Sequence, residues 1–287
     1  MEKITYLVAN YNCSKYIKEC IESLEKQTSD RWLCIICDDA SNDNSVDVIT
    51  SYLSQNIKLI KNNSNLGYIE TLERLIQEAE TDIVGFLDGD DALFPEATEA
   101  MLSIYDKNRD AEFVYSRLQL FDETLTPSEG TLGREIKPGK TSLKSGFITK
   151  LFTFRKSAYY RTEGLNKEVL YAEDRDLALK LEEVTFPIFL NKILYKYRVI
   201  LGSQSHDFER REIGLVNYIK AKKEALRRRK IKGLDKIMHE QMMNLDYIEW
   251  SNRYSEFTIW LAIYFRRILW AIDIWLKIRS DGKLRRS

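Results

Sequence analysis

Cysteine, proline, glycine and histidine are all scarce in this sequence of 287 residues, which contains 4, 4, 12 and 2 of them. So little proline and glycine excludes collagen-like and low-complexity chains. All four cysteines come before residue 40, which argues against a disulfide framework for a chain of this length. The sequence also starts directly on a strand pattern, without the apolar segment and cleavage site of a signal peptide, and we therefore expect a cytoplasmic protein.

Two of the cysteines, Cys34 and Cys37, form a Cys-x-x-Cys motif of the kind found in redox and zinc sites. The motif lies in an apolar run that predicts a strand, where residues three apart point to opposite faces of the sheet. The two interpretations are a redox or metal role and burial as small hydrophobic side chains. We expect burial for both.

Charge is balanced over the whole chain but not along it. The 44 basic and 44 acidic residues cancel, yet residues 210–287 contain 19 Lys and Arg against 9 Asp and Glu, which leaves this tail at +10 and residues 1–209 at −10. A basic tail on an acidic body is typical of proteins that bind nucleic acid or an anionic membrane surface.

Strand and helix patterns alternate from the start of the chain to residue 87. Nearly continuous apolar runs, typical of strands covered on both faces, are separated by segments with helical spacing of apolar residues. This alternation predicts an α/β domain with a mainly parallel, Rossmann-like sheet flanked by helices and a ligand crevice at the carboxyl ends of the strands. The expected strands cover residues 3–9, 32–37, 57–60 and 82–87, and the expected helices end at residues 27, 53 and 79.

The rest of the chain is less regular. Residues 122–144 are rich in Thr, Gly, Glu, Lys and Pro and predict a long surface loop, either a functional lid or a disordered segment. We expect one domain over residues 1–209 and a C-terminal helical extension over residues 210–287. The further expected elements are helices at 95–105, 173–183, 210–231, 234–252 and 255–279, and strands at 112–120, 147–155 and 186–200.

Polar clusters follow three of the expected strands. Because the carboxyl ends of parallel strands meet at one edge of a sheet, we expect these clusters to converge. Mg2+ and Mn2+ bind one or two carboxylates together with phosphate oxygens, so an Asp-x-Asp at a strand end indicates a metal–diphosphate site, with a helix-capping turn as the alternative. The clusters are Asn10-Tyr11-Asn12, Asp38-Asp39 and Asp88-Gly89-Asp90-Asp91.

Several motifs together give the sequence a family resemblance over about residues 3–206. It resembles the family 2 nucleotide-sugar glycosyltransferases of the GT-A fold, whose motifs appear here in the same order and at similar spacing. No strand is followed by Gly-x-Gly-x-x-Gly, which disfavours a dinucleotide-dependent dehydrogenase. The matching strings are Val8-Ala-Asn-Tyr-Asn12, Tyr16-Ile-x-x-Cys-Ile-x-Ser-Leu24, Gln27-Thr28, Asp38-Asp39-x-Ser41-x-Asp43, Asn65-Leu-Gly67 and Phe86-Leu-Asp-Gly-Asp-Asp91.

The resemblance assigns the donor side of the site. It implies that Ala9, Tyr11 and Asp39 hold the nucleobase. An aromatic ring and a carboxylate suit stacking and hydrogen bonding to a base, although a core tyrosine and a capping aspartate are the structural alternatives. It also implies that Asp88 lies near the ribose and the metal and that Asp90 is a direct ligand of Mn2+ or Mg2+, whereas it gives Asp91 no firm role.

For the acceptor side of the site, the candidate residues are a pair of adjacent acids. In the family a Gly-Gly-Phe-Asp motif precedes a Glu-Asp pair, and Gly164-Leu-Asn-Lys followed by Glu173-Asp174 resembles it, with a departure in the loop. The resemblance implies that Glu173 and Asp174 form the catalytic pair and that Asp174 is the base. Inverting sugar transfer needs one carboxylate to take the acceptor proton. A pair that merely caps the following helix is the alternative.

Two further residues are candidates near the end of the domain. His206 follows the last expected strand, where a histidine in the GT-A fold can complete the metal shell, although an isolated histidine is more often structural. Arg198 either meets a phosphate or forms a surface salt bridge, and we expect the salt bridge.

The last expected helix contains a run from Phe257 to Ile278 that is long enough to cross a bilayer, but its charges argue against crossing. Arg266, Asp273 and Lys277 form a narrow polar stripe beside a broad aromatic and aliphatic face, so we expect the helix to lie along an interface. An anionic membrane surface is favoured by the Trp, Tyr and basic flanks, and a homo-oligomer contact is the alternative. Nucleic acid is disfavoured because the aromatic residues do not alternate with basic ones.

The resemblance, together with these observations, implies a cytoplasmic, metal-dependent, inverting glycosyltransferase, either free in the cytoplasm or at the inner face of the cell membrane. The resemblance implies a nucleotide-sugar donor, with a UDP-sugar expected, and a glycan or glycolipid acceptor in bacterial surface polysaccharide or glycoprotein glycan synthesis. One alternative is a sugar-nucleotide pyrophosphorylase, although the Gly-rich, Arg-containing loop that it needs after the first strand is missing. The other is an inactive membrane-docking scaffold, which intact Asp90 and Asp174 argue against.

Overall fold

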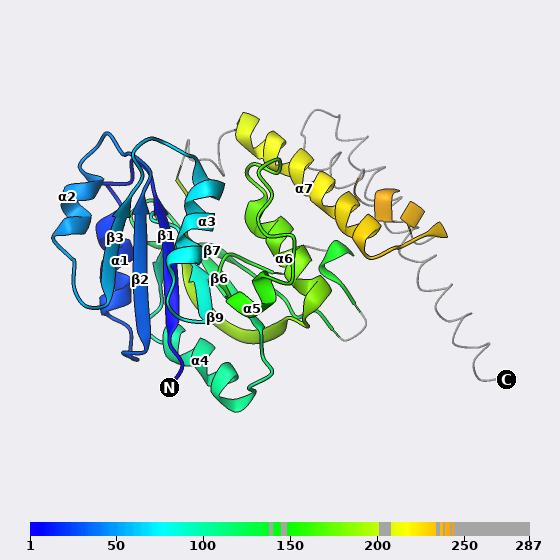
Figure 1. The fold of residues 1–287 in the computed structure, drawn as a ribbon, viewed down its shortest axis with the longest axis horizontal. Coiled ribbons are helices and arrows are strands. Elements are labelled where there is room, and N and C mark those ends of the chain that lie inside the picture. The colour runs from blue at the N-terminus through cyan, green and yellow to red at the C-terminus, as the bar shows by residue number, and fades with distance from the viewer. Residues whose placement is uncertain are drawn as a thin grey trace.

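The computed structural model describes residues 1–137, 140–144, 148–200, 208–233, 236–237, 239–241 and 243. His206 and nearly all of the helices expected at 234–252 and 255–279 lie outside these residues. Within the described part, strands and helices alternate through the first half of the chain, as the sequence predicts (Figure 1).

A single mixed sheet forms the centre of the molecule. Its strands lie in the order β3-β2-β1-β4-β8-β6-β9-β5, and β7 pairs with β6 outside this path. The pairs β3-β2, β2-β1 and β1-β4 are parallel, whereas β8 runs antiparallel to both β4 and β6. The strands are β1 (Ile4–Asn10), β2 (Trp32–Asp38), β3 (Ile57–Lys61), β4 (Ile83–Phe86), β5 (Ala92–Leu93), β6 (Phe113–Phe121), β7 (Pro127–Leu132), β8 (Phe152–Arg155) and β9 (Ile188–Arg198).

Helices cover both faces of this sheet. Apolar side chains of α1, α2 and α4 share one buried cluster with one face of the strands, and those of α3, α5 and α6 share a second cluster with the other face. This arrangement confirms the predicted α/β class with flanking helices. The helices are α1 (Ile17–Glu25), α2 (Ser45–Thr50), α3 (Tyr68–Glu78), α4 (Ala97–Lys107), α5 (Lys156–Tyr159), α6 (Glu173–Val184) and α7 (Phe208–Arg228).

The Cys-x-x-Cys motif lies in β2, as expected. Cys34 belongs to the buried cluster on one face of the sheet and Cys37 to the cluster on the other face. Both are free thiols, and burial raises the pKa of Cys37 to about 11. The two sulfurs therefore face apart, as the strand periodicity predicts.

The predicted loop at 122–144 needs a correction. Residues 127–132 form β7, which pairs antiparallel with β6 although five of its six residues are exposed and the other is only partly covered. The hairpin turn is fixed by Asp122, whose carboxylate accepts hydrogen bonds from the backbone of Thr124 and Thr126, both at 2.9 Å. A polar edge strand lacks the apolar alternation on which strand prediction depends, and so the sequence did not indicate it.

Helix α7 packs along α6 (Figure 1). A third buried cluster contains apolar side chains from both helices. It includes Tyr218, Ala221 and Ala225 of α7, Leu179 of α6, and Ala172, the residue before α6. The boundary at 209 and 210 between a domain and an extension stays a prediction. Among the described residues, no helix combines the length and the apolar character needed to cross a bilayer.

Candidate active site

Polar residues gather where β1, β2 and β4 end. The parallel register pairs Asn10 with Asp38 at the last position of β1 and β2. The Asn10 amide donates a 2.7 Å hydrogen bond to the Asp38 carboxylate, which also accepts one from the Ser41 hydroxyl at 2.6 Å. These bonds hold the two strand ends together, and so they fix one wall of the site.

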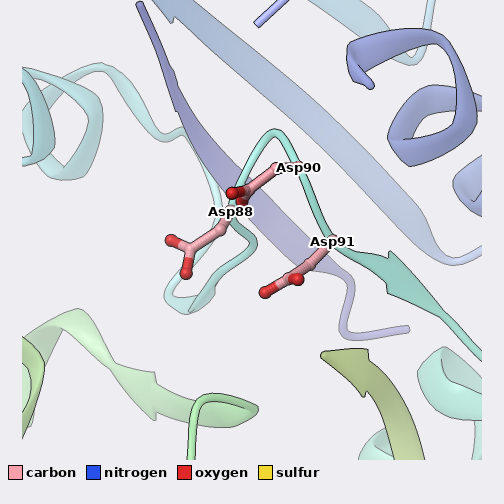
Figure 2. A group of neighbouring side chains, drawn as sticks. All are labelled: Asp88, Asp90 and Asp91. Carbon is pink, nitrogen blue, oxygen red and sulfur yellow. The ribbon is translucent and has the colours of Figure 1, made fainter. Parts of the chain in front are cut away.

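The segment Asp88-Gly-Asp-Asp91, called the aspartate turn below, connects β4 to β5 (Figure 2). Its three carboxylates offer oxygen atoms that all lie within 4.8 Å of one another. The backbone N–H of Asp91 closes the turn by donating to the carbonyl of Asp88 at 3.0 Å. Gly89 lies close to α1, because an added Cβ would stand 3.3 Å from the Ile17 side chain.

Asp91 is the anchor of this turn. Its side chain is buried, and its two oxygens accept 2.7 Å hydrogen bonds from the Tyr195 hydroxyl and from the backbone N–H of Arg198. Burial, together with the neighbouring Asp90 and Asp88, raises the pKa of Asp91 well above its usual value. Both oxygens are thus engaged by β9, and this residue fixes the position of the turn.

Asp90 is the least engaged member of the turn. Among the described residues, no other residue donates a hydrogen bond to its carboxylate. Burial, followed by the charge of Asp88, raises its pKa to about 6. The ionised Asp90 carboxylate is thus destabilised by the negative charge of Asp88. A divalent cation bound to its oxygens would remove this repulsion. Asp90 and Asp88 are therefore the residues that would hold Mg2+ or Mn2+.

Asp88 connects the turn to the opposite wall. One of its oxygens accepts a 2.7 Å hydrogen bond from the Tyr68 hydroxyl, and the other pairs with the Lys150 ammonium at 2.9 Å. Lys150 also lies 3.4 Å from the Asp174 carboxylate. Asp88 and Asp174, which the sequence predicts in one site, are thus brought together through a lysine that sequence reasoning missed.

The acid pair opens α6, and its two members differ. Glu173 is buried, and burial together with the charge of Asp174 raises its pKa to about 7. Burial also opposes ionisation of Asp174, but Lys150 and Arg175 outweigh it and lower the pKa of Asp174 below its usual value. Asp174 is therefore the member that stays ionised and faces the aspartate turn across Lys150.

The residues expected to hold a base lie at the ends of β1 and β2. Tyr11 is exposed and Ala9 is partly buried. Asp39 is buried, and it accepts hydrogen bonds from the Asn62 amide at 2.7 Å and from the backbone N–H groups of Leu66 and Gly67 at 2.8 Å each. Asp39 thus shapes the loop before α3, a contribution that the sequence did not indicate.

Arg198 differs from the predicted surface salt bridge. Its side chain is almost fully buried, and it donates to the Asp90 carbonyl at 2.6 Å and to the Glu19 carboxylate at 2.6 Å. The guanidinium also stacks over the Tyr16 ring, 4.7 Å from its centre. Arg198 therefore fastens the aspartate turn to α1, because a planar five-donor group can bridge three segments at once.

The fold and the carboxylate-lined site define a glycosyltransferase with a GT-A-like architecture. The family model described as glycosyl transferase family 2 matches residues 5–168, and the chain belongs to this family. It is 31% identical over 215 residues to the putative glycosyltransferase EpsE of Bacillus subtilis, covering 73% of this chain and 76% of that protein. It is 30% identical over 255 residues to the chondroitin synthase of Escherichia coli, covering 85% of this chain but 35% of that longer protein.

Solved structures share the fold. A fragment of TarS from Staphylococcus aureus in complex with UDP-GlcNAc superposes with a TM-score of 0.62 at 18% identity, covering 86% of this chain and 81% of that one. The mannosyltransferase PcManGT from Pyrobaculum calidifontis in complex with GDP-Man and Mn2+ gives a TM-score of 0.59 at 15% identity, covering 97% and 82%. The comparisons confirm the predicted family and fold.

Proposed function

We propose that this chain transfers a sugar from a nucleoside-diphosphate sugar to a hydroxyl group of a glycan, with inversion at the anomeric carbon. The observation that carries the proposal is the approach of two carboxylate groups from distant parts of the chain. Asp88 and Asp174 lie 2.9 and 3.4 Å from the same ammonium group. A donor-side acid and an acceptor-side acid therefore share one small volume.

On the donor side, we assign the base to Ala9, Tyr11 and Asp39, and the ribose and diphosphate to the region of Asp88 and Asp90. The family membership supports this assignment, as do the positions of these residues at the carboxyl ends of β1, β2 and β4. We favour a UDP-sugar because a fold neighbour, TarS, is described in complex with UDP-GlcNAc.

In the transfer step, Asp174 takes the proton of the acceptor hydroxyl. The acceptor oxygen forms a bond to the anomeric carbon, the bond from that carbon to the diphosphate breaks, and the diphosphate leaves with the bonding electrons. Lys150 keeps Asp174 ionised for this role. A bound Mn2+ or Mg2+ would neutralise the departing diphosphate, with Asp88 and Asp90 as its ligands and His206 as a further candidate from the sequence.

We place this activity in the synthesis of a bacterial surface polysaccharide or glycoprotein glycan at the cytoplasmic side of a membrane. Relatives named chondroitin synthase and teichoic acid poly(glycerol phosphate) polymerase support a polymer setting. The basic, aromatic C-terminal sequence favours an anionic membrane surface as a partner, with a second copy of the chain as the alternative.

A donor screen on the full chain tests the proposal. Release of nucleoside diphosphate is measured for a set of nucleotide sugars with and without Mn2+, together with D90A, D174N and D106N. Asp106 forms an exposed ion pair with Arg31 and serves as a matched control. We expect D90A to lose metal-dependent donor binding, D174N to keep binding but lose about a thousandfold in transfer, and D106N to match the parent.

The outcomes also separate the alternatives. Transfer by D174N at the parental rate would contradict the assignment of the base. A protein that instead releases pyrophosphate from a nucleoside triphosphate and a sugar phosphate would be a pyrophosphorylase. Donor binding without any turnover in the parent would identify an inactive scaffold.

A further inference from the structure

Lys150 lies between the two walls of the site because of how β8 pairs with β4. The antiparallel register pairs Gly85 with Thr153, and continuing it by three residues brings Lys150 opposite Asp88. The two strands approach closely here, since a Cβ added to Gly85 would lie 3.0 Å from the Thr153 side chain. The lysine is partly covered, with 28% of its side chain exposed. Lys150 lies two residues before β8, so the pairing of that strand with β4 helps to set its position.

The hydrogen bonds of the aspartate turn leave one carboxylate open. Both oxygens of Asp91 are engaged by β9. In Asp88, one oxygen is engaged by Tyr68 and the other by Lys150. Asp90 can bind a cation without losing a hydrogen bond from another residue, whereas a cation at the second oxygen of Asp88 would be repelled by the Lys150 ammonium beside it.

We propose that Lys150 is a positioning residue that holds Asp88 and Asp174 together before a divalent cation binds, then gives up Asp88 and remains on Asp174. This inference rests on the proposed function and deepens it. An ammonium group and a divalent cation repel each other at one oxygen, so their binding to Asp88 is competitive. The flexible stem of a lysine allows the short movement, and the contact with Asp174 gives the ammonium a second anion to stay with.

The competition gives a measurable consequence. Mn2+ titrations of the full chain without donor, followed by calorimetry or by the electron paramagnetic resonance of free Mn2+, compare the parent with K150M, K150R and K58M. Lys58 pairs with Glu80 in the segment that leads into β4 and is a control for the loss of one paired lysine. We expect K150M to bind Mn2+ at least about tenfold more tightly, and K150R and K58M to stay within about twofold of the parent.

A second readout tests the contact with Asp174. In steady-state transfer with the best donor, we expect K150M to lower kcat at least about tenfold without raising the KM for the donor, and K150R to restore part of the loss. A residue with a merely structural role would change neither Mn2+ affinity nor the split between kcat and KM in this way. Either an unchanged Mn2+ affinity or an unchanged kcat in K150M overturns the proposal.

These results are separable from a failure of the proposed function. If no nucleotide sugar is turned over by the parent, the Mn2+ titration still decides whether Lys150 competes for Asp88. If transfer is found and K150M binds Mn2+ like the parent, the inference on Lys150 fails alone. Thermal unfolding followed by circular dichroism checks the fold of each variant, and K150Q replaces K150M if that variant does not fold.

Discussion

Replacing Glu173 by Gln is expected to make the protein more stable at pH 8. The pKa of the buried Glu173 carboxyl is raised from 4.5 to about 7 by burial and by Asp174. Between these two values the folded state keeps a proton that the unfolded state has released, so the free energy of unfolding falls as the pH rises. Above pH 7 the full cost is present, and it amounts to about 3 kcal/mol.

Gln has the same shape and no charge, so E173Q removes this cost. Urea unfolding of the full chain, followed by tryptophan fluorescence, should show a gain in the free energy of unfolding that approaches about 3 kcal/mol at pH 8 and is small near pH 5. The neighbouring variant D174N should act in the opposite direction. Lys150 and Arg175 lower the pKa of Asp174 against the effect of burial, so its ionised form stabilises the fold at pH 8 and the variant loses this contribution.

Two results with E173Q would contradict this prediction. A gain in E173Q that is the same at both pH values would mean that packing, and not the charge of Glu173, changed. A stability of E173Q at pH 8 equal to that of the parent would show that the buried carboxyl is ionised there without cost. The same two variants also report on activity, since only D174N removes the proposed base.

Three further substitutions test the framework of the site by urea unfolding. K180M should lower the free energy of unfolding by about 3 kcal/mol, because Lys180 pairs with the buried Asp176 at 2.7 Å and its loss removes that ion pair; an unchanged midpoint would contradict this. G214A should weaken the packing of α7, since its Cβ would stand 2.8 Å from the Tyr171 carbonyl, and a parental midpoint would show that the helices adjust. Y195F should cost about 1–2 kcal/mol, because one oxygen of the buried anchor in the aspartate turn loses its donor; a neutral result would mean that water replaces it.

The sequence predicted well those features that depend on local pattern. Alternating apolar runs predicted the strands and helices of the first half, and the parallel topology predicted that the polar segments after β1, β2 and β4 lie at the same edge of the sheet. The family strings predicted the membership that the comparisons confirm. Each of these signals is carried by residues close together in the chain or by a topology common to α/β domains.

The remaining features depend on contacts between distant segments. Lys150 reaches Asp88 through the pairing of β8 with β4, and no periodicity distinguishes it from the other lysines of the chain. The burial of Arg198 depends on α1 lying beside the end of β9, so an exposed salt bridge was the reasonable expectation. The polar strand β7 has no apolar alternation to reveal it.

The two sides of the proposed site come from different halves of the chain. The carboxylates proposed for the donor side all precede β5, whereas the acid pair lies on α6, after the stretch that the family model covers. One lysine, two residues before β8, joins the two sides of the proposed site. Because β9 holds Asp91, substitutions in the second half that spare Lys150 and β9 are those expected to change the proposed acceptor side without moving the aspartate turn.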